Sequence, residues 1–193
     1  MSRKKQKSLD FKVIAGALKG ARIVTPDLGV TRPPLTRLRR AIFDFLGPYL
    51  DDASYLDLFS GTGSYLFEAV SRGASRAVGV ELEPQLAEAI NTQAKELGVE
   101  SSLHCYCQDV FNAIERFASN GTSFDIIMMA PPQYQGLIDQ ALTILSEHPL
   151  SAEQGIIICQ HDTSETKDID FQNYPMLQLR KYGNTTFSVL GIK

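Results

Sequence analysis

Two segments of the chain combine residue types that could bind and process a nucleotide-like ligand. In the first, Asp57-Leu58-Phe59-Ser60-Gly61-Thr62-Gly63 follows a short apolar run and precedes an amphipathic stretch. Glycines in such a turn let the backbone approach a ligand closely. Glu81 ends the next apolar run, where a carboxylate can hold the two hydroxyls of a ribose. The pattern predicts a nucleoside site, and the alternative is a glycine-rich turn without a ligand.

The glycine spacing restricts which nucleotide the turn could hold. Leu66 stands where a dinucleotide-binding G-x-G-x-x-G loop needs its third glycine, and no G-x-x-x-x-G-K-[ST] loop is present. Asp57 favours a ligand with an ammonium group over a pyrophosphate. S-adenosylmethionine carries an ammonium, a ribose diol and an adenine. We therefore expect S-adenosylmethionine, with Asp57 near the methionine end, Glu81 at the ribose and Gln108-Asp109 at the adenine.

Asp109 has a second interpretation, because it could equally cap the N-terminus of the following helix, and both roles can hold together. The predicted cofactor-binding residues are Asp57, Phe59, Ser60, Gly61, Thr62, Gly63, Glu81, Leu82, Asp109 and Val110.

Short apolar runs alternate with amphipathic stretches from Tyr55 onward, which predicts an α/β fold with a mainly parallel sheet covered by helices on both faces. The expected strands are 55–59, 77–81, 103–107, 124–129 and 156–159, and the expected helices are 62–71, 84–97, 111–118 and 137–145. Residues 176–182 and 186–192 read as an antiparallel pair joined across Gly183-Asn184. Residues 11–24 predict a small N-terminal β-hairpin that turns near Gly16 or Gly20. Residues 35–50 predict a helix with Leu38, Ile42, Phe45 and Tyr49 buried.

Charge is divided unevenly along the 193 residues, although the net charge is only −3. Residues 1–40 carry eleven Lys and Arg against two acids, whereas residues 41–193 are strongly acidic. A basic front end on an acidic body suggests an anionic partner that approaches from one side.

Several classes of protein are disfavoured by composition. The apolar runs are far shorter than a membrane span, and the first residues lack the apolar stretch of a secretory signal. Three cysteines without C-x-x-C spacing do not suggest a disulfide framework, so we expect a cytoplasmic protein. We expect no metal at His104, Cys105 and Cys107, because neighbouring strand positions point to opposite faces. We also expect a monomer.

The second chemical segment, Ala130-Pro131-Pro132-Gln133-Tyr134, follows the run 124–129, and its Pro-Pro pair predicts a rigid, extended loop. At this point the chain from about Val13 onward resembles the bacterial methyltransferases that modify a guanine N2 in small-subunit (16S) ribosomal RNA. The resemblance rests on Gly16-Ala17-Leu18-Lys19-Gly20, Arg32-Pro33 with Arg37, Arg39, Ala41 and Phe43, the loop 57–63, Glu68-Ala69 with Ser71-Arg72-Gly73-Ala74, and Arg180-Lys181-Tyr182-Gly183 with Thr185.

The resemblance implies a Rossmann-like methyltransferase fold, S-adenosylmethionine as cofactor and ribosomal RNA or the small ribosomal subunit as partner. It also implies a reaction motif [DN]-P-P-[FY], in which the polar residue and a proline carbonyl accept hydrogen bonds from the target amino group and the aromatic ring stacks on the flipped base. Here Ala130 replaces the polar residue and Gln133 the aromatic, with Tyr134 one place later. The predicted catalytic residues are Ala130, Pro131, Pro132, Gln133 and Tyr134.

Three explanations of the altered motif stay open. The enzyme is active with Gln133 as acceptor and Tyr134 as stacking partner, or the chain binds cofactor and RNA but transfers little or no methyl, or it acts on a different nucleic-acid acceptor. The predicted RNA-binding residues are Lys19, Arg22, Arg32, Arg37, Arg39 and Arg40, although Arg32 could instead lie at the cofactor. We divide the chain into a basic flexible tail at 1–10, a hairpin extension at 11–34 and a methyltransferase domain at 35–193.

Overall fold

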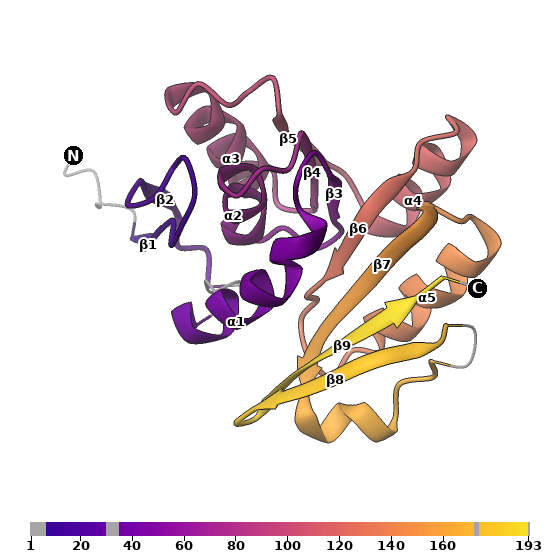
Figure 1. The fold of residues 1–193 in the computed structure, drawn as a ribbon. Coiled ribbons are helices and arrows are strands. Elements are labelled where there is room, and N and C mark those ends of the chain that lie inside the picture. Colours follow the sequence, from indigo (N-terminus) through magenta and orange to yellow (C-terminus); the bar gives the residue numbers. More distant parts are fainter. Residues whose placement is uncertain (1–6, 30–34, 172–173, 193) are drawn as a thin grey trace, which may run out of the picture.

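A seven-stranded sheet forms the centre of the protein in the computed structural model, which describes residues 7–29, 35–171 and 174–192. Its strand order is β5-β4-β3-β6-β7-β9-β8. The strands are β3 (Ser54–Asp57), β4 (Arg76–Glu81), β5 (Leu103–Cys107), β6 (Phe124–Met129), β7 (Ser151–Asp162), β8 (Met176–Tyr182) and β9 (Thr185–Gly191). The first five pair in parallel, and β9 runs antiparallel to both β7 and β8. The predicted α/β class and the closing antiparallel hairpin are confirmed (Figure 1).

Helices cover both faces of this sheet, as the continuous apolar strands require. One buried cluster lies under the first three helices and the other under the last two (Figure 1). The helices are α1 (Thr36–Leu46), α2 (Ser64–Ser71) and α3 (Pro84–Glu96) on one face, and α4 (Val110–Ser119) and α5 (Leu137–Glu147) on the other. Short 3₁₀ turns, η1 (Gly47–Tyr49) and η2 (Thr163–Lys167), follow α1 and β7.

The N-terminal hairpin is present but longer than expected. It pairs β1 (Ser8–Lys12) with β2 (Arg22–Pro26) as a separate two-stranded sheet. Its first strand begins at Ser8, before the expected boundary at Phe11, so part of the stretch predicted as a flexible tail is a strand. Residues 1–6 lie outside the described part of the chain.

Helix α1 ends earlier than predicted. The residue before a proline is biased away from helical geometry, and Gly47-Pro48 converts the last turn to the 3₁₀ segment η1. Tyr49 therefore leaves the predicted buried stripe and is 48% exposed. The stripe instead contains Leu38, Arg39 and Ile42, followed by Phe43 and Leu46.

Candidate functional site

The predicted cofactor loop connects the end of β3 to the start of α2, and the end of β4 lies against it. The Gly61 amide donates to Glu81 Oε2 at 2.7 Å, and the Glu83 amide donates to Glu81 Oε1 at 2.9 Å. Burial raises the pKa of the Glu81 carboxyl, and these backbone hydrogen bonds oppose the rise. The structure thus brings Gly61 and Glu81 together at the carboxyl edge of the sheet, where open α/β sheets bind ligands.

Asp57 is the most deeply buried acid of this loop. Its side chain has no exposed surface, and Oδ1 accepts a hydrogen bond from the Phe59 amide at 3.3 Å. Oδ2 has no hydrogen-bond partner among the described residues. Burial, with a smaller contribution from the charge of Glu81, raises the pKa of Asp57 to about 7, and the hydrogen bond from the Phe59 amide opposes the rise. A buried oxygen without a donor fits a cationic ligand group, such as the ammonium of S-adenosylmethionine.

A close approach inside the sheet supports the loop from below. A Cβ atom on Gly79 of β4 would lie 2.6 Å from Ser60 Oγ and 2.6 Å from Leu66 Cδ1. Ser60 Oγ in turn donates to the Asp57 carbonyl at 3.1 Å. Sequence reasoning missed Gly79, although a glycine inside an apolar strand is a known signal for such an approach. A side chain at Gly79 would therefore collide with Ser60 of the loop and with Leu66 of α2.

The other predicted cofactor residues differ in how far they are accessible. Ser60 and Thr62 are buried, Phe59 and Gly61 are half-buried, and Leu82 is exposed. Asp109 Oδ1 accepts from the amides of Phe111 and Asn112 at 3.0 and 3.1 Å. The capping interpretation of Asp109 is therefore confirmed, with Val110 as the first residue of α4. Its adenine role stays a prediction.

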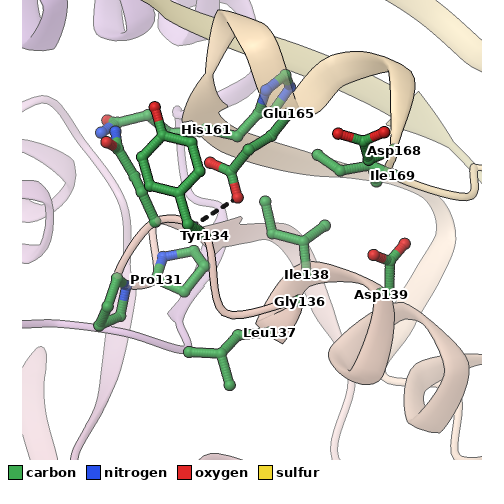
Figure 2. A pocket seen from close by; sticks show the side chains of 13 residues that line it. Pro131, Tyr134, Gly136, Leu137, Ile138, Asp139, His161, Glu165, Asp168 and Ile169 are labelled. Atoms are coloured by element: carbon green, nitrogen blue, oxygen red, sulfur yellow. Dashed lines mark hydrogen bonds between the residues drawn. The ribbon is translucent and has the colours of Figure 1, made fainter.

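The loop after β6 adjoins a pocket of about 290 Å³. Pro131, Pro132, Gln133 and Tyr134 line the pocket, together with side chains from α5, β7 and η2. Gln133 and Tyr134 are exposed, and Tyr134 has a left-handed φ of 61°. Figure 2 shows the Tyr134 ring beside His161 and Glu165. The loop therefore presents an aromatic ring and an amide to solvent at the edge of this pocket.

Glu165 holds this loop in place, and sequence reasoning did not identify it. Its Oε1 accepts from the Tyr134 amide at 2.7 Å, while Oε2 accepts from the Asp162 amide at 3.2 Å (Figure 2). The second bond belongs to a capping box between Asp162 and Glu165 at the start of η2. A D-x-x-E spacing after an apolar run is the signal that could have revealed it.

The predicted RNA-binding cations do not form one exposed group. Lys19, Arg37 and Arg40 are exposed, and Arg22 pairs with Asp10 at 2.9 Å on the surface. Arg32 lies outside the described residues. Arg39 is 1% exposed, so its prediction as an RNA-binding residue is wrong. Arg39 lies one helical turn before Phe43, on the buried stripe of α1. This position buries Arg39 despite its charge.

Two stretches that carried the family resemblance form one contact. The Ile14 amide donates to Glu68 Oε1 at 2.6 Å, and the Leu18 amide donates to Ser71 Oγ at 2.9 Å. The Ala17 amide donates to the Ser71 carbonyl at 2.7 Å. The turn between β1 and β2 is thus fixed to the end of α2, so the basic hairpin has a defined position on the domain.

Metal ligation and membrane spanning find no support in the described residues. His104 and Cys107 are exposed while Cys105 is buried. No group of three or more His, Cys, Asp or Glu side chains in residues 7–29, 35–171 and 174–192 is arranged to hold a metal. Within the same ranges, no helix has the length and apolar character needed to cross a bilayer.

Two known proteins have sequences similar to that of this chain over most of its length. "Putative rRNA methyltransferase YlbH" of Bacillus subtilis strain 168 is 28% identical over 179 residues, covering 93% of this chain and 97% of the relative. "Ribosomal RNA small subunit methyltransferase D" of Escherichia coli K12 is 27% identical over 154 residues, covering 79% of this chain and 75% of the relative.

Solved structures share the fold. "Putative methyltransferase yhhF" from Escherichia coli aligns with a TM-score of 0.84 at 22% identity, over 95% of this chain and 98% of that chain. The Thermus thermophilus 16S rRNA N2 G1207 methyltransferase, in complex with AdoMet and guanosine, aligns with a TM-score of 0.72 at 16% identity, over 100% of this chain and 52% of that chain. The Rossmann-like methyltransferase fold is therefore confirmed.

A family model decides the assignment. The model described as "Conserved hypothetical protein 95" matches residues 11–191, which is nearly the whole chain. The sequence relatives above are named as rRNA methyltransferases, one aligned structure contains AdoMet, and the loop 57–63 with Glu81 fits S-adenosylmethionine as cofactor. The chain belongs to the "Conserved hypothetical protein 95" family, and the sequence relatives that it resembles are named as rRNA methyltransferases.

Proposed function

We propose that the protein methylates the exocyclic N2 of a guanine in small-subunit (16S) ribosomal RNA. One observation carries the proposal. The strands that bear the two chemical segments are neighbours, because Asp57 pairs with Met128 and the Leu58 amide donates to the Met128 carbonyl at 3.0 Å. The cofactor loop and the loop that begins at Ala130 therefore leave the sheet side by side. A methyl donor on one loop would lie next to a base held on the other.

Some residues at this edge of the sheet bind the cofactor, and others bind the target base. S-adenosylmethionine supplies the electrophilic methyl group when it is bound. Asp57 would face its ammonium, Glu81 its ribose and Asp109 its adenine. Asp57 and Glu81 end the neighbouring strands β3 and β4, and Asp109 lies two residues after the end of the next strand, β5. Tyr134, which is 67% exposed, offers a ring on which a flipped base can stack. The structural relative that binds guanosine together with AdoMet supports guanine as the base.

The methyl acceptor is ribosomal RNA or a small-subunit particle. The protein acts in the cytoplasm, and it acts as a monomer. Lys19, Arg37 and Arg40 supply exposed positive charge on the turn after β1 and on the first turns of α1. The fixed position of the hairpin on α2 keeps the charge of Lys19 at a constant place relative to the domain. Such cations bind phosphates and the shape of the RNA rather than particular bases.

Ala130 supports a second candidate function, that of a cofactor- and RNA-binding homologue with weak or no transfer. A methyl side chain cannot accept a hydrogen bond from the target amino group. Loss of one oriented polar partner at a reaction centre costs about 10²–10³-fold in rate. A related candidate is a methyltransferase with another nucleic-acid acceptor, since the altered motif could suit a different amino group.

Methyl transfer from radiolabelled S-adenosylmethionine to small-subunit particles and to naked 16S rRNA separates these candidates. The wild-type protein is compared with Ala130→Asp, and cofactor binding is measured for both by calorimetry. We expect transfer to guanine N2 by the wild type and faster transfer by Ala130→Asp. No transfer from either protein, with cofactor still bound, would favour the binding homologue. Transfer to another base or only to DNA would favour the changed acceptor.

A further inference from the structure

Ala130 leaves the reaction loop without the polar side chain that the resembled motif has at this position. The neighbouring strand β7 carries a polar residue, Gln160, close to this position. In the parallel pairing of β6 and β7, the last pair is Met129 with Cys159, and Ala130 and Gln160 each come one residue after it. Neighbouring strands lie about 4.8 Å apart. Gln160 is therefore the polar residue on β7 at the height of Ala130.

The two residues also share a face of the sheet. Met128 on β6 and Ile158 on β7 belong to the buried cluster beneath α1, α2 and α3, and Ala130 packs against the same cluster. Side chains alternate between faces along a strand, so Gln160 follows Ile158 onto this face. A contact with α2 agrees with this, because the Tyr65 hydroxyl donates a hydrogen bond to Gln160 Oε1.

Tyr65 fixes the orientation of the Gln160 amide. The ring is 4% exposed within the cluster, and burial raises the pKa of its hydroxyl well above the usual value, with the charge of Asp57 adding to the rise. The hydroxyl therefore stays protonated and remains a donor. An amide oxygen has a second lone pair, and its nitrogen has two hydrogens. Gln160 is half-buried and lines the pocket beside Pro131 and Pro132.

Phe187 of β9, the strand on the other side of β7, lies beside Gln160. Gln160 pairs with Phe187 on β9, and the Phe187 ring stacks on Tyr182 with centroids 5.7 Å apart. The ring centroids of Phe187 and Phe45 of α1 lie 6.2 Å apart. Phe187 forms an apolar wall on one side of the amide and Ala130 lies on the other, so the half-buried amide is partly removed from water, where a hydrogen bond to a ligand is strengthened.

We propose that Gln160 is the hydrogen-bond partner of the target guanine, with Oε1 accepting from the N2 amino group and Nε2 donating to the ring N3. This inference rests on the function proposed above. Guanine presents an amino donor and an N3 acceptor side by side on its minor-groove edge, and an amide matches both at once. Adenine has no amino group at C2, so the same contact selects guanine. Tyr65 is a positioning residue that acts through the amide.

Four variants test this assignment in single-turnover methyl transfer to small-subunit particles. Gln160→Leu removes both hydrogen bonds and should lower kcat by about 10²–10³-fold while leaving the dissociation constant of the cofactor unchanged. Gln160→Glu retains an acceptor and should lose less. Tyr65→Phe should lower kcat with little change in KM. Gln154→Leu, the same replacement at an exposed position of β7, is the matched control and should behave as the wild type.

A rescue experiment separates a contact with the base from a merely structural role. In the double variant Ala130→Asp/Gln160→Leu, the new carboxylate supplies the missing acceptor one strand away, so Ala130→Asp should raise transfer at least about 10-fold more in the Gln160→Leu background than in the wild-type background. Absence of rescue in a double variant that folds and binds cofactor would overturn the assignment. So would full activity of Gln160→Leu, or a larger loss in Gln133→Leu than in Gln160→Leu.

The wild-type protein distinguishes failure of this inference from failure of the proposed function. If the wild type transfers methyl groups and Gln160→Leu does so equally well, only the role of Gln160 is lost. If the wild type binds S-adenosylmethionine but transfers nothing to guanine, the proposed function fails, and the role of Gln160 is overturned with it. Circular dichroism melting of every variant identifies any loss that comes from unfolding.

Discussion

Arg39 and Glu68 form an ion pair inside the protein, with Arg39 Nε 3.3 Å from Glu68 Oε1 and side chains that are 1% and 0% exposed. Arg39 Nη2 also donates to the Lys12 carbonyl at 2.6 Å. Glu68 Oε2 accepts from Arg72 Nε at 3.1 Å. Burial lowers the pKa of Arg39, and the charge of Glu68 opposes that change. The pair connects β1, α1 and α2, so it serves the structure rather than RNA.

Removal of this buried arginine should destabilise the protein strongly. Arg39→Ala leaves the buried Glu68 carboxylate with Arg72 as its remaining ion-pair partner. Loss of one partner of a buried pair costs up to about 3–5 kcal/mol in the free energy of unfolding. Arg40→Ala, one residue further along, removes an exposed charge and should change it by less than about 0.5 kcal/mol. Urea denaturation of both variants provides the measurement. Equal stability of the two would contradict the buried pair.

Two glycines of the N-terminal turn provide a matched pair of substitutions. Gly16 and Gly20 have φ values of 85° and 86°, so alanine is strained to the same degree at both. A Cβ on Gly16 would lie 1.7 Å from the Ser71 carbonyl oxygen, whereas a Cβ on Gly20 has no neighbour within 4 Å. Gly20→Ala should cost roughly 1 kcal/mol. Gly16→Ala should cost more and release the turn from α2.

Hydrogen exchange at the Ala17 and Leu18 amides measures that release. Both amides donate to Ser71, so their protection should fall in Gly16→Ala and persist in Gly20→Ala. Similar protection in the two variants would show that the hairpin does not depend on this close approach.

Affinity for S-adenosylmethionine should rise with pH around neutrality. Asp57 has a pKa of about 7 in the folded protein, because burial disfavours its charged form. A cationic cofactor group favours the carboxylate, so binding is weaker at pH 6, where Asp57 is mainly protonated, and stronger at pH 8. Calorimetric titrations between these values test the slope. In Asp57→Asn the affinity should be low and the slope largely absent, and an unchanged slope would assign the titration to another group.

The same ionisation should affect stability in the opposite direction. The pKa of Asp57 is higher in the folded protein than the ordinary value of 3.8, so the folded state binds more protons than the unfolded state between these pKa values. The contribution of Asp57 to the free energy of unfolding therefore falls as pH rises from about 4 to about 7, by at most roughly 4 kcal/mol. Asp57→Asn should be more stable than the wild type at pH 8 and bind cofactor poorly. Urea midpoints at pH 5 and pH 8 compare the two proteins.

RNA affinity should depend on salt through the exposed cations alone. Each phosphate contact that is lost reduces the slope of log affinity against log salt by about 0.7–0.9. We expect such a reduction in Arg37→Ala and in Arg40→Ala. Lys95→Ala, which removes an exposed cation from the last turn of α3, is the control and should keep the wild-type slope. Filter binding from 50 to 200 mM salt measures the slopes, and identical slopes in all variants would place the RNA elsewhere.

Strands with continuous apolar runs could be predicted closely from the sequence. The expected bounds of β5, β6 and β8 agree with the structure. β7 is longer than expected, because its first residues, Ser151 to Gln154, are mainly polar, and the register with β6 shifts between the pair Phe124–Ser151 and the pair Ile126–Ile156. The apolar pattern identifies buried positions, but it does not show where backbone pairing continues at the surface.

Residue type predicted contacts between side chains less well than the apolar pattern predicted strands. Gly61 and Glu81 could be placed together because two parallel strands end at one edge. Arg39 and Glu68 could not, because a charge reads as exposed unless its partner in the folded structure is known. The role of Gln160 could not be predicted from the sequence for a related reason. Its role follows from the pairing of β6 with β7, and no sequence spacing connects it to Ala130.

The position of β9 between β7 and β8 has a consequence for synthesis of the chain. Translation delivers β7, then β8, and only afterwards the strand that pairs with both. Until residues 185–191 have left the ribosome, the free edge of β7 from Ile156 to Asp162 has no partner, and Phe187 is not yet beside Gln160. A nascent chain that has already formed its cofactor loop therefore still lacks one wall of the reaction site. Catalytic competence should appear as a late event in biosynthesis, after S-adenosylmethionine binding.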